Sequence, residues 1–419
     1  MKPPRRHVAA AKTQGRISGL KSQNKIVFSN DVQALHRVEW VWLVLAAGLN
    51  QPPLMFAAGH SDSAVLVYFG TYTRANSRGI YVSKFEPASG RLGPPELAAE
   101  TRNPSFLARH PTRPLLYAVA ETDSFAGQRA GAVSAFRVEA TGKLTLLNQR
   151  PSGGTGPCHL AVDHTGKCLL VANYGSGSVD ALALEDDGRL GDGGMSVQHR
   201  GSSTNAQRQT GPHAHFLTAT PDNRFAVACD LGLDKVLVYR LDPARAVLAP
   251  NDPPGVSVAP GSGPRHLAFH PHGRFVYVLN ELACTLDVFD YDPSSGTLKP
   301  LQTVRTLPED FKGENSCAEI QVHPSGKFVY ASNRGHNSIA VFSVDRKTGR
   351  LAAVEHTPSR GATPRHFLLS PDGRWLIAEN QDSNNIAVFG VDPNSGRLHP
   401  TGQEMALGAP ACALFVESN

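Results

Sequence analysis

The sequence lacks the cysteine patterns that bind metals or attach haem. Its six cysteines form no Cys-x-x-Cys pair, no Cys-x-x-Cys-His run and no zinc-ligand spacing. These absences argue against a haem-bearing protein and against a small secreted domain built on disulfides. We interpret the cysteines as small core residues, because unpaired cysteines are among the most often buried side chains. They are Cys158, Cys168, Cys229, Cys284, Cys317 and Cys412.

The sequence also lacks a basic run with interleaved aromatic residues. Lysine and arginine outnumber aspartate and glutamate by 41 to 36, but the excess gathers in the first 25 residues, which contain no acid. The remaining basic residues are dispersed along the chain. Nothing therefore predicts a nucleic-acid surface.

One stretch near the N-terminus, residues 40–59, is long and free of charge. Asn50, Gln51 and two prolines make it a poor membrane span, so no stable span is predicted. It resembles the apolar part of a signal peptide that starts too far along the chain. A displaced export signal, a mis-assigned start and a disordered extension all remain open. We treat residues 1–62 as an N-terminal extension and residues 63–419 as one folded domain.

What the sequence has in abundance is glycine and proline, 39 and 31 residues, and they mark a repeat. Each copy has an apolar strand, a turn typically of the form Pro-x-Gly-Arg/Lys, a second apolar strand, an Asn or Asp in most copies, and a third strand. Six copies follow one another at spacings of 47 to 57 residues. Four alternating strands at this period are typical of β-propeller blades. The aligned turn residues are Arg113, Gly166, Asn223, Gly273, Gly326 and Gly373.

The two ends of the chain together supply a seventh unit. Residues 408–419 hold only a first strand, and residues 65–92 hold the other three. We predict an all-β, seven-bladed β-propeller with four antiparallel strands per blade. The ring closes by pairing the C-terminal strand with the N-terminal strands, which removes the sheet edges that an open array would expose.

The column just inside the first strand contains residues that packing does not explain. Packing alone favours small or apolar side chains here, yet three positions are charged or imidazole groups. The column reads Ser105, Cys158, His215, Arg265, Ala318, Arg365 and Ala411. The next residues should face the opposite side of the sheet, where hydrogen bonding between blades is one interpretation. They include His159, His266, Glu319 and His366.

The turn after the second strand gives two further columns. The first is always Asn or Asp in the five clear copies, which favours capping of turn amides and tolerance of unusual dihedral angles. Its members are Asn173, Asp230, Asn280, Asn333 and Asn380. The second varies, and a turn position that needs no particular side chain is free to carry chemistry. It reads Glu121, Tyr174, Leu231, Glu281, Arg334 and Gln381.

These columns predict one candidate site at the channel mouth. Guanidinium groups bind carboxylate or phosphate through paired hydrogen bonds, and a carboxylate beside an imidazole can activate water. A ring of inter-blade salt bridges is the structural alternative. Two histidines separated by one residue are a weak metal signal, so no metal is predicted. The candidate residues are His213, His215, Arg265, Glu281 and Arg334, with Arg365 at the rim.

Five segments resemble the seven-bladed propeller lactonases, a family that includes cycloisomerase-2-type 6-phosphogluconolactonases and fungal carboxy-cis,cis-muconate cyclising enzymes. The segments are FGTYT (69–73), PHAHF (212–216), CDLGLDKV (229–236), GPRH with NEL (263–282) and residues 319–339. The resemblance covers about residues 65–415. It implies a site of His213 or His215 with Arg265, Glu281 and Arg334, and it implies no metal or other cofactor. It also implies a cytoplasmic location, unless residues 40–59 direct export.

The resemblance leads us to expect hydrolysis of 6-phospho-D-glucono-1,5-lactone, a small anionic sugar lactone. Arg265 and Arg334 would bind it, with Arg365 at the rim. Glu281 would act as general base and a histidine as acid, or the reverse. A lactonase or lactonising isomerase of muconate-type acids is one alternative. A non-catalytic propeller, whose arginines pair with fixed acids and leave no open pocket, is the other. The oligomeric state is not predicted.

Overall fold

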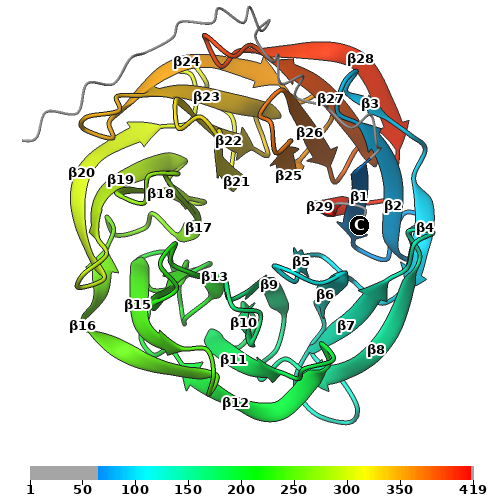
Figure 1. Ribbon diagram of the computed structural model, residues 1–419. Helices are drawn as coiled ribbons and strands as arrows, with labels where there is room; N and C mark the ends of the chain where they lie inside the picture. The colour runs from blue at the N-terminus through cyan, green and yellow to red at the C-terminus, as the bar shows by residue number, and fades with distance from the viewer. Residues whose placement is uncertain (1–64, 417–419) are drawn as a thin grey trace, which may run out of the picture. The chain divides into compact units, whose positions relative to one another are not determined.

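The computed structural model describes residues 65–416, which form seven antiparallel sheets arranged in a ring (Figure 1). Six sheets have four strands each. In the seventh, two short strands share the outer position, since both pair with the same neighbour. No helix occurs within residues 65–416. The predicted all-β, seven-bladed propeller is confirmed.

The blades are numbered in chain order, and the first strand of each lies innermost (Figure 1). Blade 1 is β5 (Leu107–Arg109), β6 (Leu115–Ala120), β7 (Ala132–Val138) and β8 (Leu144–Pro151). Blade 2 is β9 (Pro157–Val162), β10 (Cys168–Asn173), β11 (Ser178–Leu184) and β12 (Leu190–Gln198). Blade 3 is β13 (Ala214–Ala219), β14 (Phe225–Asp230), β15 (Lys235–Asp242) and β16 (Val247–Ser257). Blade 4 is β17 (Pro264–Phe269), β18 (Phe275–Asn280), β19 (Thr285–Asp292) and β20 (Thr297–Arg305).

The remaining blades complete the ring. Blade 5 is β21 (Cys317–Val322), β22 (Phe328–Asn333), β23 (Ser338–Val344) and β24 (Leu351–Pro358). Blade 6 is β25 (Pro364–Leu369), β26 (Trp375–Asn380), β27 (Asn385–Val391) and β28 (Leu398–Ala406). Blade 7 is β29 (Pro410–Val416), β1 (Val65–Thr71), β2 (Gly79–Glu86), β3 (Arg91–Leu92) and β4 (Glu96–Glu100).

Blade 7 closes the ring as the sequence predicts. Its inner strand β29 comes from the C-terminal end and pairs with β1 from Leu66 opposite Val416 to Thr71 opposite Pro410. The innermost edge of β1 is thereby covered, and the blade gains the same four positions as its neighbours.

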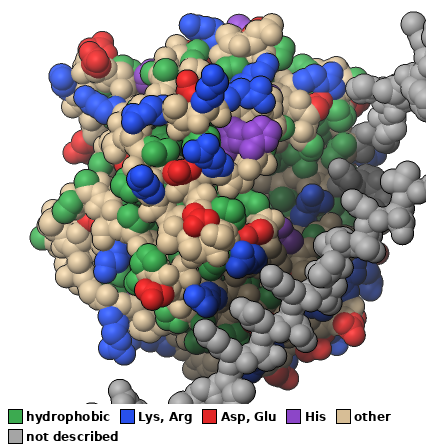
Figure 2. Space-filling view, turned by 60° about the vertical axis from the view of Figure 1, so that its left-hand side comes forward, with side chains coloured by type: hydrophobic (Ala, Val, Ile, Leu, Met, Phe, Trp, Pro, Cys, Tyr) green, Lys and Arg blue, Asp and Glu red, His purple; other side chains and the backbone are tan. Residues whose placement is uncertain are grey.

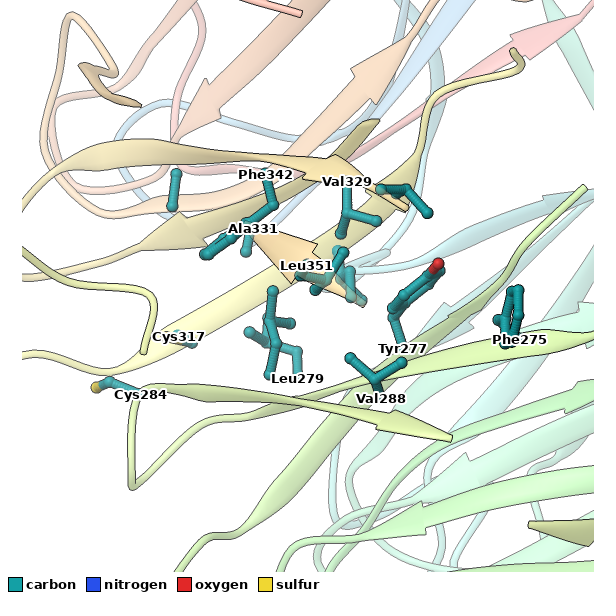
Figure 3. Close-up of a cluster of buried hydrophobic side chains, with 14 residues drawn as sticks. Phe275, Tyr277, Leu279, Cys284, Val288, Cys317, Val329, Ala331, Phe342 and Leu351 are labelled. Carbon is teal, nitrogen blue, oxygen red and sulfur yellow. The ribbon is translucent and has the colours of Figure 1, made fainter. Parts of the chain in front are cut away.

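The core consists of apolar clusters between adjacent blades. Figure 3 shows the cluster between blades 4 and 5, where Tyr277 and Val288 face Val329 and Phe342. These side chains are at most 1 % exposed, and burying each contributes roughly 1.5–3 kcal/mol. All six cysteines are buried free thiols, as predicted. This packing holds each inner strand in place, and the functional residues lie where those strands begin.

The His-Pro-x-Gly turns tie neighbouring blades together at the opposite face from the candidate site. The Nε2 atom of His270 in blade 4 donates to the carbonyl oxygen of Gly326 in blade 5 at 3.0 Å. His323 makes the same bond to Gly373 in blade 6, also at 3.0 Å. These glycines have φ near +70°, a conformation that side chains disfavour (Gly326 +69°, Gly373 +72°).

Gly326→Ala is expected to lower the free energy of unfolding by about 2–3 kcal/mol. The new Cβ would lie 2.6 Å from Nε2 of His270, in addition to the strain of the positive φ. Gly273→Ala is the matched control, because Gly273 has φ +72° but a Cβ added there would meet no atom within 4 Å; it should cost about 1 kcal/mol. Urea unfolding of both variants measures the difference. Equal losses would show that the His270 contact does not matter.

The predicted N-terminal extension, residues 1–62, lies outside the described residues, and so does the charge-free segment 40–59. Within residues 65–416, no helix is long and apolar enough to cross a membrane. On the face shown in Figure 2, Lys and Arg side chains are interspersed with Asp and Glu.

Candidate active site

A β-bulge at the start of the innermost strand places the predicted polar column at the channel mouth. In blade 4, Pro264 and His266 pair with consecutive residues of β18, which leaves Arg265 as the extra residue. The same irregularity leaves His215 extra in blade 3 and Arg365 extra in blade 6. Bulges re-aim side chains and often lie beside active sites. The repeat therefore carries these residues to equivalent positions.

Beneath the bulges, a belt of side chains fills the channel. The ring of Phe106 in blade 1 lies 4.3 Å from that of His159, 5.9 Å from His266 and 5.8 Å from His366. Because these rings come from blades 1, 2, 4 and 6, they meet near the axis of the propeller. The belt forms a floor below the candidate site.

The belt also contains the predicted hydrogen bonds of buried histidines. Nδ1 of His266 lies 2.9 Å from Oε2 of Glu319 in the next blade, which confirms the inter-blade interpretation for this pair. Nδ1 of His366 bonds instead to Glu379 of its own blade at 2.8 Å. Burial raises the pKa of Glu319 to about 7.

Glu319→Gln is expected to flatten the dependence of stability on pH. The raised pKa means that the folded protein holds this proton more tightly than the unfolded chain. The resulting stability is fully present below the unfolded pKa and is lost as pH rises through about 7. As the pH rises from about 5 to 8, the free energy of unfolding of the variant should fall by roughly 1–3 kcal/mol less than that of wild type. Urea unfolding at both pH values tests this, with the exposed Glu96→Gln as control. Equal losses in all three proteins would contradict it.

The repeated Asn/Asp column is structural, but its members act in different ways. Oδ1 of Asp230 accepts from the backbone N–H of His213 and of two turn residues at 2.9–3.1 Å, as predicted. Asn280 instead donates its amide to Asp287 of the neighbouring strand at 2.8 Å. The left-handed backbone lies further along the turn, at Cys284 with φ +55°. The capping prediction is therefore wrong for Asn280.

Glu281 is the centre of the cluster that the structure assembles. Its backbone N–H donates to Gly263 and its carbonyl accepts from Cys317, so the turn joins its own inner strand to the next blade. Its Oε2 lies 3.0 Å from Nε of Arg265 and 2.9 Å from Nη2 of Arg334. The Glu281 carboxylate is 5 % exposed and the Arg265 side chain 3 %. The structure thus brings together three of the predicted residues.

The charges of this cluster are strongly coupled. Burial alone would raise the pKa of Glu281, but the guanidinium groups of Arg334 and Arg265 hold it well below its usual range. Burial, with the nearby charges of Arg334 and Arg365, lowers the pKa of Arg265 to about 10. At neutral pH the Glu281 carboxylate is therefore ionised and a weak base, and Arg265 remains charged.

A third arginine at the cluster, Arg208, is not among the predicted residues. Its Nη2 lies 2.8 Å from Oε1 of Glu281 and 3.2 Å from the hydroxyl of Tyr174. Arg208 belongs to the connection between β12 and β13. The adjacent Gln209 anchors that connection by donating to the carbonyl of Leu231 and to Asp234, both at 2.8 Å. Because this connection has no counterpart in the repeat, column alignment cannot reveal Arg208.

The two histidines of the PHAH segment have different environments. Nδ1 of His213 donates to the carbonyl of Tyr174 at 2.9 Å, and its ring stacks on Tyr174 at 4.4 Å. This bond fixes the tautomer and leaves Nε2 as the acceptor nitrogen. His215 is buried, with Nδ1 3.7 Å from the Cys158 sulfur. Burial and the Arg265 charge hold the pKa of His215 well below its usual value.

Arg365 does not join the Glu281 cluster. Its guanidinium lies 5.1 Å from the centre of the Tyr72 ring. The Tyr72 hydroxyl donates to Glu121 at 2.8 Å, and Glu121 also accepts from the hydroxyl of Ser105. A hollow of about 350 Å³ adjoins this group. Its lining residues are Tyr72, Arg74, Asn103, Arg365 and Gln381.

The structure offers no metal centre in the part of the chain that it describes. Within residues 65–416, no group of three or more His, Cys, Asp or Glu side chains is arranged to hold a metal ion. The polar groups that the mouth itself offers a substrate are its arginines, its carboxylate and its imidazoles.

Known proteins resemble this chain over the whole propeller. Residues 66–415 match the family described as lactonase, 7-bladed beta-propeller. The chain belongs to this lactonase family. It is 38% identical to the 6-phosphogluconolactonase of Bacillus subtilis over 302 residues, which covers 72% of this chain and 84% of the relative. The lactonase is accordingly an ester hydrolase that opens lactones.

Two solved structures share the fold of the lactonase. The periplasmic gluconolactonase PpgL of Pseudomonas aeruginosa has a TM-score of 0.79 and 35% identity, covering 85% of this chain and all of the other. A Lactobacillus plantarum protein, named without an activity, has a TM-score of 0.78 and 31% identity over 85% of this chain and all of the other.

The arginines of the lactonase do not point freely into a cavity. Arg265 and Arg334 both form ion pairs with Glu281. Their pairing is the feature that a non-catalytic propeller would show. This pairing does not neutralise the charge of the cluster, because Arg208 also contacts the Glu281 carboxylate. Three guanidinium groups around one carboxylate leave net positive charge at the mouth.

Proposed function

We propose that the lactonase hydrolyses 6-phospho-D-glucono-1,5-lactone to 6-phosphogluconate. The observation that carries this proposal is the Glu281 cluster, which Arg208 and Tyr174 link to His213, in a chain related to a protein named 6-phosphogluconolactonase. The cluster supplies cationic donors, and His213 supplies an acceptor nitrogen. Hydrolysis of a lactone needs both, since water must lose a proton while the carbonyl oxygen becomes an anion.

His213 is the general base in this proposal. Glu281 is disfavoured because its low pKa makes it a poor proton acceptor. His215 is disfavoured because it is buried and its pKa is also low. His213 is only partly buried, and its Nδ1–H bond to Tyr174 orients Nε2 as the acceptor. Of the two assignments open from sequence, the environment supports the histidine as base.

The arginines stabilise the oxyanion. Arg265 and Arg334 are held rigidly, since Arg265 also donates to the carbonyl of Ala318 and Arg334 to that of Cys317. Preorganised donors stabilise a developing charge without reorganising during the reaction. After water attacks the carbonyl carbon, the C–O bond to the ring oxygen breaks. His213, now protonated, returns its proton to that oxygen. Glu281 orients the two guanidinium groups.

The proposal is tested with purified full-length protein and freshly prepared phosphorylated lactone. Acid release in a pH-stat, corrected for spontaneous hydrolysis, should show turnover that saturates with substrate. Glucono-1,5-lactone and a muconate-type lactone, assayed in parallel, test the competing substrate classes. No acceleration of the phosphorylated lactone, or faster turnover of the muconate-type lactone, would contradict the proposal.

A further inference from the structure

Arg365 differs from the other arginines of the mouth in having no carboxylate partner. Arg208, Arg265 and Arg334 all bind Glu281. Within residues 65–416, the Arg365 guanidinium makes neither an ion pair nor a hydrogen bond, although its side chain is only partly exposed. A guanidinium has five N–H donors, and leaving them without partners in a partly desolvated place is costly unless a ligand takes them.

The hollow beside Arg365 has the donors that an anion requires. It measures about 350 Å³ and also exposes Arg74, which pairs with Asp382 at 3.1 Å. Both partners of that pair are more than half exposed (58% and 51%), and such surface pairs contribute little stability. Arg74 can therefore turn toward a bound anion at little cost. The other nearby acid, Glu121, already accepts from Tyr72.

A second unpartnered group lines the same hollow. Gln381 is 8 % exposed, and its Oε1 has no hydrogen-bond partner among the described residues, while its Nε2 donates to Asp382 at 3.0 Å. This oxygen is shielded from solvent, so the side chain must turn before a hydroxyl group of a ligand can donate to it. The hollow thus suits an anion attached to a hydroxyl-bearing carbon chain.

The hollow and the Glu281 cluster are contributed by different blades, although Arg365 lies near enough to Arg265 for its charge to act on it. Tyr72, Asn103 and Arg365 belong to blades 7, 1 and 6, whereas Glu281 and Arg334 belong to blades 4 and 5 (Figure 1). A ligand can therefore place one of its ends in the hollow and the other at the Glu281 cluster. Arg265 and Arg334 are already paired with the Glu281 charge, which leaves Arg365 as the better partner for a strongly anionic group.

We propose that the Arg365 hollow is the phosphate subsite of the lactonase, separate from the site that opens the ring. The assignment rests on the proposed function, because it takes the substrate to be a phosphorylated sugar lactone. The phosphate binds Arg365 and Arg74, and a sugar hydroxyl donates to Gln381. The Glu281 cluster and His213 hold the lactone carbonyl. Arg365 thereby determines the preference for phosphorylated over plain lactones.

Arg365→Gln is the first test, with kcat and KM measured on the phosphorylated lactone and on glucono-1,5-lactone. Loss of a charged hydrogen bond should lower kcat/KM for the phosphorylated lactone about 30-fold or more, mainly through KM. Turnover of the plain lactone should change less than about threefold. Arg374→Gln is the matched control, since Arg374 lies in the same blade on the β25–β26 turn and pairs there with Asp372. Equal losses on both substrates, or none on the phosphorylated one, would overturn the assignment.

A second test of the subsite does not depend on turnover. It measures the binding of inorganic phosphate and of 6-phosphogluconate by titration calorimetry. Wild type and Arg374→Gln should bind both anions, and Arg365→Gln should bind them at least about 30-fold more weakly. This result would support the subsite even if wild type opened neither lactone, in which case the proposed function alone would fail. Equal binding by all three proteins, or no binding by wild type, would overturn it.

Discussion

Glu281→Gln is expected to lower kcat/KM for the phosphorylated lactone by about 1,000-fold or more. Glu281 holds the guanidinium groups of Arg265 and Arg334 in position, and a neutral amide cannot hold both through ion pairs. Misplaced donors no longer meet the developing oxyanion. The rate of acid release, corrected for spontaneous hydrolysis, measures the loss.

The same substitution should lower the free energy of unfolding by about 3–5 kcal/mol, because it leaves the buried guanidinium group of Arg265 and the partly buried one of Arg334 without this counter-charge. Combining it with Arg334→Gln should recover part of that stability but none of the activity. Urea unfolding of the single and double variants separates the two effects. Ring opening by Glu281→Gln at the wild-type rate would contradict the role given to this cluster.

His213→Ala is expected to lower kcat by about 1,000-fold while KM changes less than about threefold. The imidazole takes part in proton transfer and contributes little to binding the substrate. Because the ring is only partly buried, added free imidazole should enter the vacated space and restore part of kcat. Steady-state kinetics at increasing imidazole concentration measures this recovery.

His164→Ala is the control for that experiment. His164 is exposed on the turn between β9 and β10, away from the mouth. The kcat of this variant should therefore equal that of wild type and should not change when imidazole is added. The lower kcat/KM of His213→Ala could instead come from a higher KM and not recover with imidazole. That result would show that His213 binds substrate and is not the base.

The repeat was sufficient to predict the fold and the meeting of three candidate residues. Glu281 and Arg334 occupy the same turn column in adjacent blades, and Arg265 lies in the first-strand column of the blade that contains Glu281. The closing pair of strands was predictable for the same reason, since each chain end held the part of a blade that the other lacked.

What the repeat could not predict lies outside its columns or depends on local contacts. Arg208 belongs to a connection that occurs once, so no column contains it. The choice of His213 over Glu281 as base depends on the charges packed around each group, which no alignment of a chain with itself can show. The roles of the Asn column also differ, because each depends on the next strand offering a carboxylate or a hydroxyl.

The central claim is that the mouth holds a phosphorylated sugar lactone between the Glu281 cluster and the Arg365 hollow. A crystal structure of the His213→Ala variant with 6-phosphogluconate tests it most directly. The account predicts that the product carboxylate lies against Arg265 and Arg334, and that the phosphate lies against Arg365. A phosphate bound at the Glu281 cluster, or a product bound away from the mouth, would contradict the account.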